Sequence, residues 1–176
     1  MNNAGFGTYG AFMDTDIDRQ LEMVELNSVS LTGICHYAIP HMGEGSLLIN
    51  VASLASFIPL GNFAVYGATK AYVLSFSIAL AAEIADRGIF VSTLCPGPVD
   101  TEFARIASNG ARKTVVDGKD PRKVVAHCLS RSAKGKRISI MAPKWKFKAF
   151  MSRFVGRYFF ARWSFIHEKR PSSPKA

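Results

Sequence analysis

Three residues suited to proton transfer, Ser53, Tyr66 and Lys70, lie within one short stretch of the chain. Tyr66 and Lys70 are four residues apart, so on a helix they share one face and can touch. Ser53 lies thirteen residues before Tyr66, at the end of an apolar run typical of a strand. A phenol, an ammonium group and a hydroxyl at one point predict proton exchange with a carbonyl or alcohol oxygen.

The ordinary pKa of a tyrosine phenol is too high for efficient proton exchange near neutral pH. A free tyrosine has a pKa of about 10, and a nearby ammonium group stabilises the phenolate and lowers that value. We therefore expect Lys70 to lower the pKa of Tyr66, Tyr66 to exchange the proton, and Ser53 to hydrogen-bond the substrate oxygen. Each residue also has an ordinary structural interpretation: a packed aromatic ring, a solvated helix charge and a helix cap.

Further motifs flank these residues in a fixed order. Asn2-Asn3-Ala4-Gly5 opens the chain, Asn27 follows, and the strand after the Tyr-Lys helix ends in Pro96-Gly97-Pro98-Val99-Asp100-Thr101. With Ser53, Tyr66 and Lys70, this set resembles the classical short-chain dehydrogenase/reductase family, and its NNAGFG form resembles a bacterial branch. The resemblance runs from residue 2 to about residue 142.

The resemblance implies a doubly wound α/β fold of the Rossmann type and an oxidoreductase that interconverts a carbonyl and an alcohol. It implies the cofactor NAD(P), with NADP favoured. It assigns Lys70 to the nicotinamide ribose and Asn27 to a water that relays protons. The implied catalytic residues are Asn27, Ser53, Tyr66 and Lys70. The implied cofactor-binding residues are Asn3, Ala4, Gly5, Tyr66, Lys70, Pro96, Gly97, Val99 and Thr101.

A dinucleotide-binding fold also needs a glycine-rich turn after its first strand. Gly5, Gly7 and Gly10 have the spacing, but no strand precedes them in this chain. The sequence therefore resembles the C-terminal two thirds of such a reductase, truncated at its N-terminus, and we expect this chain to be inactive by itself. The alternative is a non-enzymatic truncated product, or a membrane-peripheral binding module that retains the same residues.

Helices and strands alternate along the chain, which predicts a parallel sheet. Asp14, Thr15 and Asp16 are candidate caps for a helix that runs to about Ile39. The expected strands are residues 46–51, 89–95 and 137–141, and the other helices are residues 63–87 and 121–132. Residues 102–118 are expected to form a substrate lid.

The charge of the protein is concentrated after residue 133. This part has twelve basic residues and one acidic residue, a net charge of +11 in a chain of net +9, so the preceding part carries −2. Residues 144–167 are also dense in Phe, Tyr and Trp, several at helical spacing. A basic aromatic amphipathic helix can lie on an anionic membrane surface. A helix that packs on the lid or on a second copy is the alternative, and nothing in the chain resembles a nucleic-acid-binding fold.

Composition supports a single folded unit, since 48% of the 176 residues are hydrophobic,. Cys35, Cys95 and Cys128 are an odd number without metal spacing, which predicts buried thiols and no metal site. We expect a partial catalytic domain over residues 1–142, a helical extension over 143–170 and a disordered tail over 171–176. We expect a cytoplasmic homo-oligomer that is peripheral to the membrane if the extension binds lipid. We expect its substrate to be a small carbonyl or alcohol compound, and a lipophilic one if the aromatic extension reflects the substrate.

Overall fold

The computed structural model describes residues 1–172. Three strands form a parallel sheet in the order β1–β2–β3: β1 (Leu47–Val51), β2 (Phe90–Leu94) and β3 (Ile138–Ser139). The segment at Asn2 runs parallel to β1, with its backbone hydrogen-bonded to Ile49 and Val51. The predicted α/β fold is confirmed, although β3 is shorter than the expected strand.

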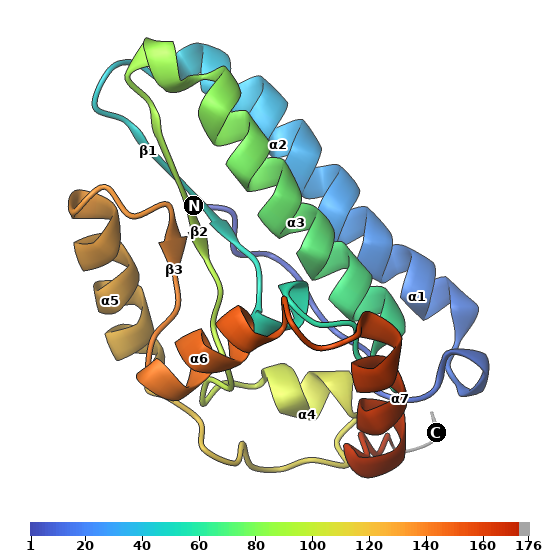
Figure 1. The fold of residues 1–176 in the computed structure, drawn as a ribbon. Helices are drawn as coiled ribbons and strands as arrows, with labels where there is room; N and C mark the ends of the chain where they lie inside the picture. Colours follow the sequence, from blue (N-terminus) through green and yellow to red (C-terminus); the bar gives the residue numbers. More distant parts are fainter. Residues whose placement is uncertain (173–176) are drawn as a thin grey trace.

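Helices cover both faces of the sheet (Figure 1). One face carries α3 (Ala64–Glu83) and the long helical stretch of α1 (Ile17–Val24), a π-helical turn (Glu25–Ser30) and α2 (Leu31–Ala38). The other face carries α5 (Pro121–Ala133). Leu48 and Val91 pack toward α3, whereas Ile49 and Leu94 pack toward Val124 and Cys128 of α5. This alternation follows from the two-residue period of a strand.

Capping residues set the helix ends as the sequence predicts. Asp16 accepts hydrogen bonds from the backbone N–H of Asp18 and Arg19 and starts α1. Gly88 has a φ of 67°, the left-handed conformation that glycine adopts without strain, and ends the helical turn after α3,. Helix α3 is long and apolar enough to span a membrane by length and composition alone, yet it packs against the sheet as part of the core.

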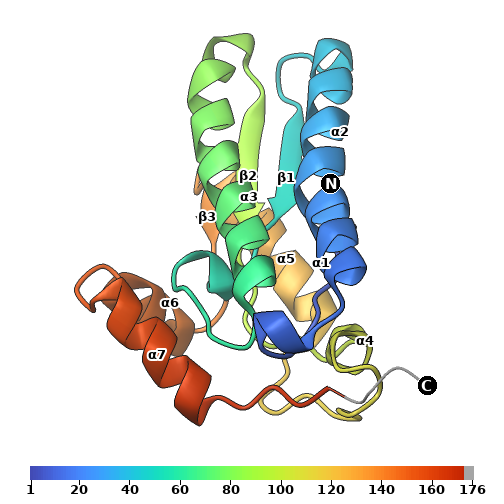
Figure 2. The same cartoon turned by 90° about the vertical axis from the view of Figure 1, so that its right-hand side faces the viewer.

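Two parts of the chain differ from the expected elements. The lid contains a short helix, α4 (Phe103–Ala107), that no sequence pattern indicated. The aromatic extension is not one continuous helix, because residues 152–156 separate α6 (Pro143–Met151) from α7 (Arg157–His167). This segment contains Gly156, and glycine has a low helix propensity. Figure 1 and Figure 2 place α6 and α7 at the end of the molecule that also carries α4. The disordered tail expected over 171–176 falls largely on residues 173–176, which lie outside the described residues.

Candidate active site

A cavity of about 1160 Å³ lies at the carboxyl ends of β1 and β2. Parallel α/β sheets bind ligands at this edge. Most residues singled out from the sequence line the cavity: Asn3, Gly5, Ser53, Tyr66, Lys70, Pro96, Gly97, Val99 and Thr101. Asn27 lies just behind the wall, while Ala4 is exposed and does not line the cavity.

Tyr66 lies in the first turn of α3, with its ring packed among other aromatic rings. It stacks on Phe63 with ring centroids 4.1 Å apart, and Phe103 of the lid helix lies 5.4 Å away. Burial raises the pKa of Tyr66 to about 12, and the Ser53 side chain opposes this shift by hydrogen-bonding the phenol. The expectation that Lys70 lowers this pKa is therefore wrong for this structure, because the cost of burying a phenolate is larger.

Lys70 is buried one turn further along α3. Its Nζ donates a hydrogen bond to the carbonyl oxygen of Val51, 2.9 Å away, and lies 5.9 Å from the ring centroid of Tyr66. Burial lowers the pKa of Lys70 to about 8, opposed by the neighbouring Cys95. An ammonium group with one carbonyl partner keeps two further N–H donors for other ligands.

Ser53 follows β1 and caps the short helical turn after it. Its Oγ accepts a hydrogen bond from the backbone N–H of Ala55, and the backbone N–H of Ser53 donates to Oγ of Ser56. The Ser56 hydroxyl in turn donates to the carbonyl oxygen of Lys70, 2.7 Å away. This chain of contacts ties the loop after β1 to α3, and it brings Ser53 and Tyr66 together.

Asn27 is fully buried within the π-helical turn between α1 and α2. Its side chain pairs with the backbone of Phe6 in both directions, and Nδ2 also donates to Oγ1 of Thr69, 3.1 Å away. A side chain at Gly5 would lie 2.7 Å from Oδ1 of Asn27 and 3.3 Å from Nζ of Lys70. Only glycine therefore lets the backbone approach this point, and π-helical turns are common at functional sites.

The lid is joined to the loop after β2 by backbone hydrogen bonds. Lys119 donates to the carbonyl oxygen of Pro98, and Asp100 donates to that of Lys119. Thr101 is exposed at the rim of the cavity, where Oγ1 accepts a long hydrogen bond from the backbone N–H of Phe103. The loop and the lid therefore form one connected wall.

The C-terminal extension forms another part of the cavity wall, which no motif indicated. Its lining residues are Trp145, Lys148, Phe160, Glu168 and Arg170. A side chain at Gly97 would lie 2.8 Å from Nε1 of Trp145, so glycine permits this close packing. The backbone N–H of Gly61 donates to Oγ of Ser164, and Arg170 donates to the carbonyl oxygen of Gly61. Packing of this segment on the lid was one alternative from the sequence, and these contacts show that part of the segment packs beside the cavity.

Comparisons with known proteins agree with this architecture. A family model described as "Enoyl-(Acyl carrier protein) reductase" matches residues 1–127. "Probable oxidoreductase EphD" from Mycobacterium tuberculosis is 28% identical over 163 residues, covering 82% of this chain and 28% of the relative. "Sulfoacetaldehyde reductase" from Chromohalobacter salexigens is 33% identical over 114 residues, covering 62% of this chain and 45% of the relative. The chain thus spans less than half the length of these relatives.

Solved structures share the fold. A short-chain dehydrogenase from Burkholderia cenocepacia in complex with NADP has a TM-score of 0.76 at 23% identity, covering 91% of this chain and 65% of that chain. One from Sphingobium yanoikuyae in complex with NADPH has a TM-score of 0.72 at 24% identity, covering 87% of this chain and 61% of that chain. The family match over most of the chain, the shared fold and the convergence of the motif residues on one cavity agree, and the chain belongs to the short-chain dehydrogenase/reductase family.

Proposed function

We propose that this protein carries the catalytic part of an oxidoreductase that interconverts a carbonyl and an alcohol with a nicotinamide cofactor. The observation that carries the proposal is the convergence of Ser53, Tyr66 and Lys70 on one cavity at the carboxyl ends of the strands. Family membership supports the same reaction class.

Proton transfer is the part of the reaction that these residues perform. With its pKa raised to about 12, Tyr66 is protonated at neutral pH and acts as the acid that protonates a carbonyl oxygen during reduction. Ser53, which hydrogen-bonds the phenol, orients the same oxygen. Lys70 holds the nicotinamide ribose and Asn27 holds a water molecule. Through these groups a proton returns to Tyr66.

The cavity also has features that fit a nicotinamide cofactor. The backbone at Gly5 passes so close to Asn27 and Lys70 that a side chain has no room there, and the loop after β2 also lines the cavity. Asn3, Gly5, Lys70, Pro96, Gly97, Val99 and Thr101 are the residues that would hold the cofactor, and we favour NADP among the nicotinamide nucleotides. When bound, the cofactor supplies the hydride.

Nucleotide titration and turnover together test this proposal. In a form of the protein that carries the nucleotide turn, we expect NADPH to bind at a site that includes Lys70, and Lys70→Ala to weaken this binding. We expect NADPH oxidation with a panel of ketones and aldehydes in a form of the protein that carries the nucleotide turn. If such a form binds NADPH but reduces no carbonyl compound, the non-enzymatic alternative is correct.

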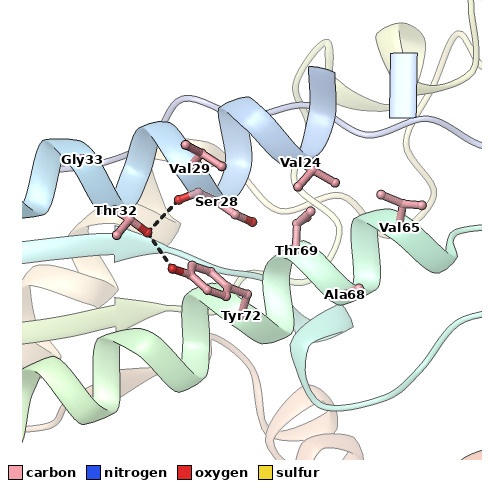
Figure 3. Close-up of a pocket in the computed structure, with 9 residues that line it drawn as sticks. All are labelled: Val24, Ser28, Val29, Thr32, Gly33, Val65, Ala68, Thr69 and Tyr72. Carbon is pink, nitrogen blue, oxygen red and sulfur yellow. Dashed lines mark hydrogen bonds between the residues drawn. The ribbon is translucent and has the colours of Figure 1, made fainter. Parts of the chain in front are cut away.

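A hydrophobic groove on the surface favours a homo-oligomer. Figure 3 shows the groove between the α1–α2 stretch and α3, where Val24, Val29, Val65 and Tyr72 lie among small residues. The hydroxyl groups of Thr32 and Tyr72 are 2.7 Å apart and join the two helices across it. Ile17, Leu21 and Ile34 are also exposed on the same helical stretch. We propose that a second copy covers this surface, since large exposed apolar patches mark interfaces.

The outer surface of α6 and α7 supports contact with an anionic membrane. Five aromatic residues are at least half exposed there: Phe147, Phe150, Phe154, Tyr158 and Phe159. Residues 143–167 contain six Lys and Arg residues and no acidic residue. The opposite faces of the two helices, with Ala149 and Ser164, are buried. We propose that the exposed aromatic residues enter the interface while the cations contact lipid headgroups, which places a cytoplasmic protein at the membrane surface.

A further inference from the structure

Two arginines lie in the wall of the cavity, on the far side of the aromatic residues that flank Tyr66. Cζ of Arg170 lies 5.1 Å from the ring centroid of Phe63, which stacks on Tyr66. Cζ of Arg112, from the lid, lies 5.2 Å from the ring centroid of Tyr9. Tyr9 and Phe63 are themselves in edge contact, with centroids 4.8 Å apart. One aromatic ring, Phe63, therefore connects Arg170 to the catalytic phenol, and two rings, Tyr9 and Phe63, connect Arg112 to it.

Both arginines are held in place by the C-terminal segment. Arg112 Nη2 donates to the carbonyl oxygen of Lys169, 2.9 Å away. Arg170 Nη1 donates to the carbonyl oxygen of Gly61, and Nη2 donates to Oε2 of Glu168, each at 3.0 Å. The side chain of Arg170 is only 14% exposed. Preorganised guanidinium groups of this kind recognise planar anions through paired hydrogen bonds.

Positive charge exceeds negative charge at this end of the cavity. Arg112, Lys148 and Arg170 line it together with Glu168, which contacts both Lys148 and Arg170. Glu102, also in the lining, pairs with Arg105 at 2.6 Å. Within residues 1–172, Arg112 has no acidic partner. Burial lowers the pKa of Arg170, Glu168 opposes the shift and Arg112 adds to it by repulsion.

The cavity that holds these cations and the catalytic residues also has many apolar side chains in its lining. They include Phe6, Tyr9, Leu60, Phe63, Phe103 and Phe160. A ligand that spans from Tyr66 to the arginines must therefore present an apolar body to these rings and a charged group beyond them. An uncharged lipophilic compound would fill the apolar part but leave the guanidinium groups without an anion.

We propose that Arg112 and Arg170 form an anion subsite, and that the substrate is a carbonyl compound whose apolar body ends in a carboxylate. The assignment rests on the proposed function only for the carbonyl end of the ligand. The subsite itself stands on the two arginines, their aromatic neighbours and the excess of positive charge. Arg112 is the better position for a test substitution, because Arg170 also donates a hydrogen bond to the backbone carbonyl of Gly61.

Binding of decanoate and of 1-decanol to the chain tests the subsite without turnover. Trp145 lines the cavity, so its fluorescence in the Trp163→Phe variant reports occupancy. We expect decanoate to bind at least about tenfold more tightly than 1-decanol, and Arg112→Gln to remove this difference while leaving 1-decanol unchanged. Arg112→Lys should restore part of the difference. Lys113→Gln, in the same lid but outside the cavity lining, should leave both affinities unchanged.

The outcomes separate this proposal from the catalytic one. Tyr66→Phe should bind decanoate normally, so a missing reductase activity would leave the subsite intact. Equal affinities for decanoate and 1-decanol, or an Arg112→Gln variant that retains the preference, would overturn the subsite and leave the catalytic proposal standing. If Lys113→Gln weakens decanoate binding as much as Arg112→Gln does, the anion binds outside the cavity and the assignment is wrong.

Discussion

The Nζ of Lys70 on α3 donates a hydrogen bond to the carbonyl oxygen of Val51, the last residue of β1, across 2.9 Å. This contact fixes the ammonium group at the carboxyl edge of the sheet, beside the backbone at Gly5. The position serves the site at a cost in stability, because the same burial lowers the pKa of Lys70 to about 8. Several measurable consequences follow from this relationship and from the contacts around it.

Lys70→Met should stabilise the fold at neutral pH while it abolishes function. The folded-state pKa of Lys70 lies below the ordinary 10.5, so the cost of the buried charge is fully present below about pH 8 and disappears as pH rises toward the unfolded value. The shift corresponds to about 3 kcal/mol, and losing the hydrogen bond to Val51 returns about 1 kcal/mol. Thermal unfolding should show a higher Tm at pH 7 and a shrinking difference above pH 8. A variant less stable than the parent at pH 7 would contradict this.

Tyr66→Phe should leave the fold intact and remove the proton donor. The phenyl ring retains its stacking on Phe63, so circular dichroism and Tm should change little. In a form of the protein that turns over, kcat should fall by at least ~10²-fold, as expected when a general acid is lost. Tyr37→Phe, at an exposed tyrosine outside this cavity, is the control. Near-normal steady-state reduction by Tyr66→Phe would refute the role of this residue.

Asn27→Ala should destabilise the protein by about 2–3 kcal/mol, because it leaves the buried backbone groups of Phe6 and the hydroxyl of Thr69 without this partner. Urea unfolding measures the difference. Val29→Ala is the control, since Val29 lies in the same π-helical turn but is 52% exposed. Equal losses in the free energy of unfolding for the two substitutions would show that the hydrogen bonds of Asn27 do not stabilise the fold.

Val24→Glu and Tyr72→Glu should each dissociate the proposed oligomer, since a carboxylate in a covered apolar surface loses its hydration. Sedimentation velocity over a range of concentrations gives the oligomeric state. Val116→Glu places the same charge on the lid, where the side chain is 84% exposed, and should have no effect. A parent protein that is monomeric at all concentrations would rule out the second copy in the groove.

The protein should sediment with vesicles that contain phosphatidylserine and not with phosphatidylcholine vesicles. Salt should weaken the binding, because it screens exposed charges. Phe150→Ser with Phe154→Ser should reduce binding at least ~10-fold even at low salt, since burying one phenylalanine contributes about 2 kcal/mol. Phe12→Ser with Met13→Ser removes apolar side chains exposed elsewhere and should leave binding unchanged. Absence of binding to anionic vesicles would favour the packing alternative for α6 and α7.

The sequence by itself determined the α/β class, the main helices and strands, and most residues of the candidate site. These features depend on local patterns: apolar runs, the caps at Asp16 and Gly88, and motif residues whose strand-end positions bring them to one sheet edge. The burial of Cys35, Cys95 and Cys128 was predicted from their odd number and their lack of metal-ligand spacing.

Only the tertiary structure decided how charge and shape are distributed around the site. The pKa of Tyr66 is raised because rings from distant segments bury it, which spacing to Lys70 cannot reveal. The approach of Trp145 to Gly97 joins segments that are distant in the sequence. Arg112 and Arg170 are 58 residues apart and carry no motif, so their meeting at one cavity follows only from how the lid and the C-terminal segment pack together.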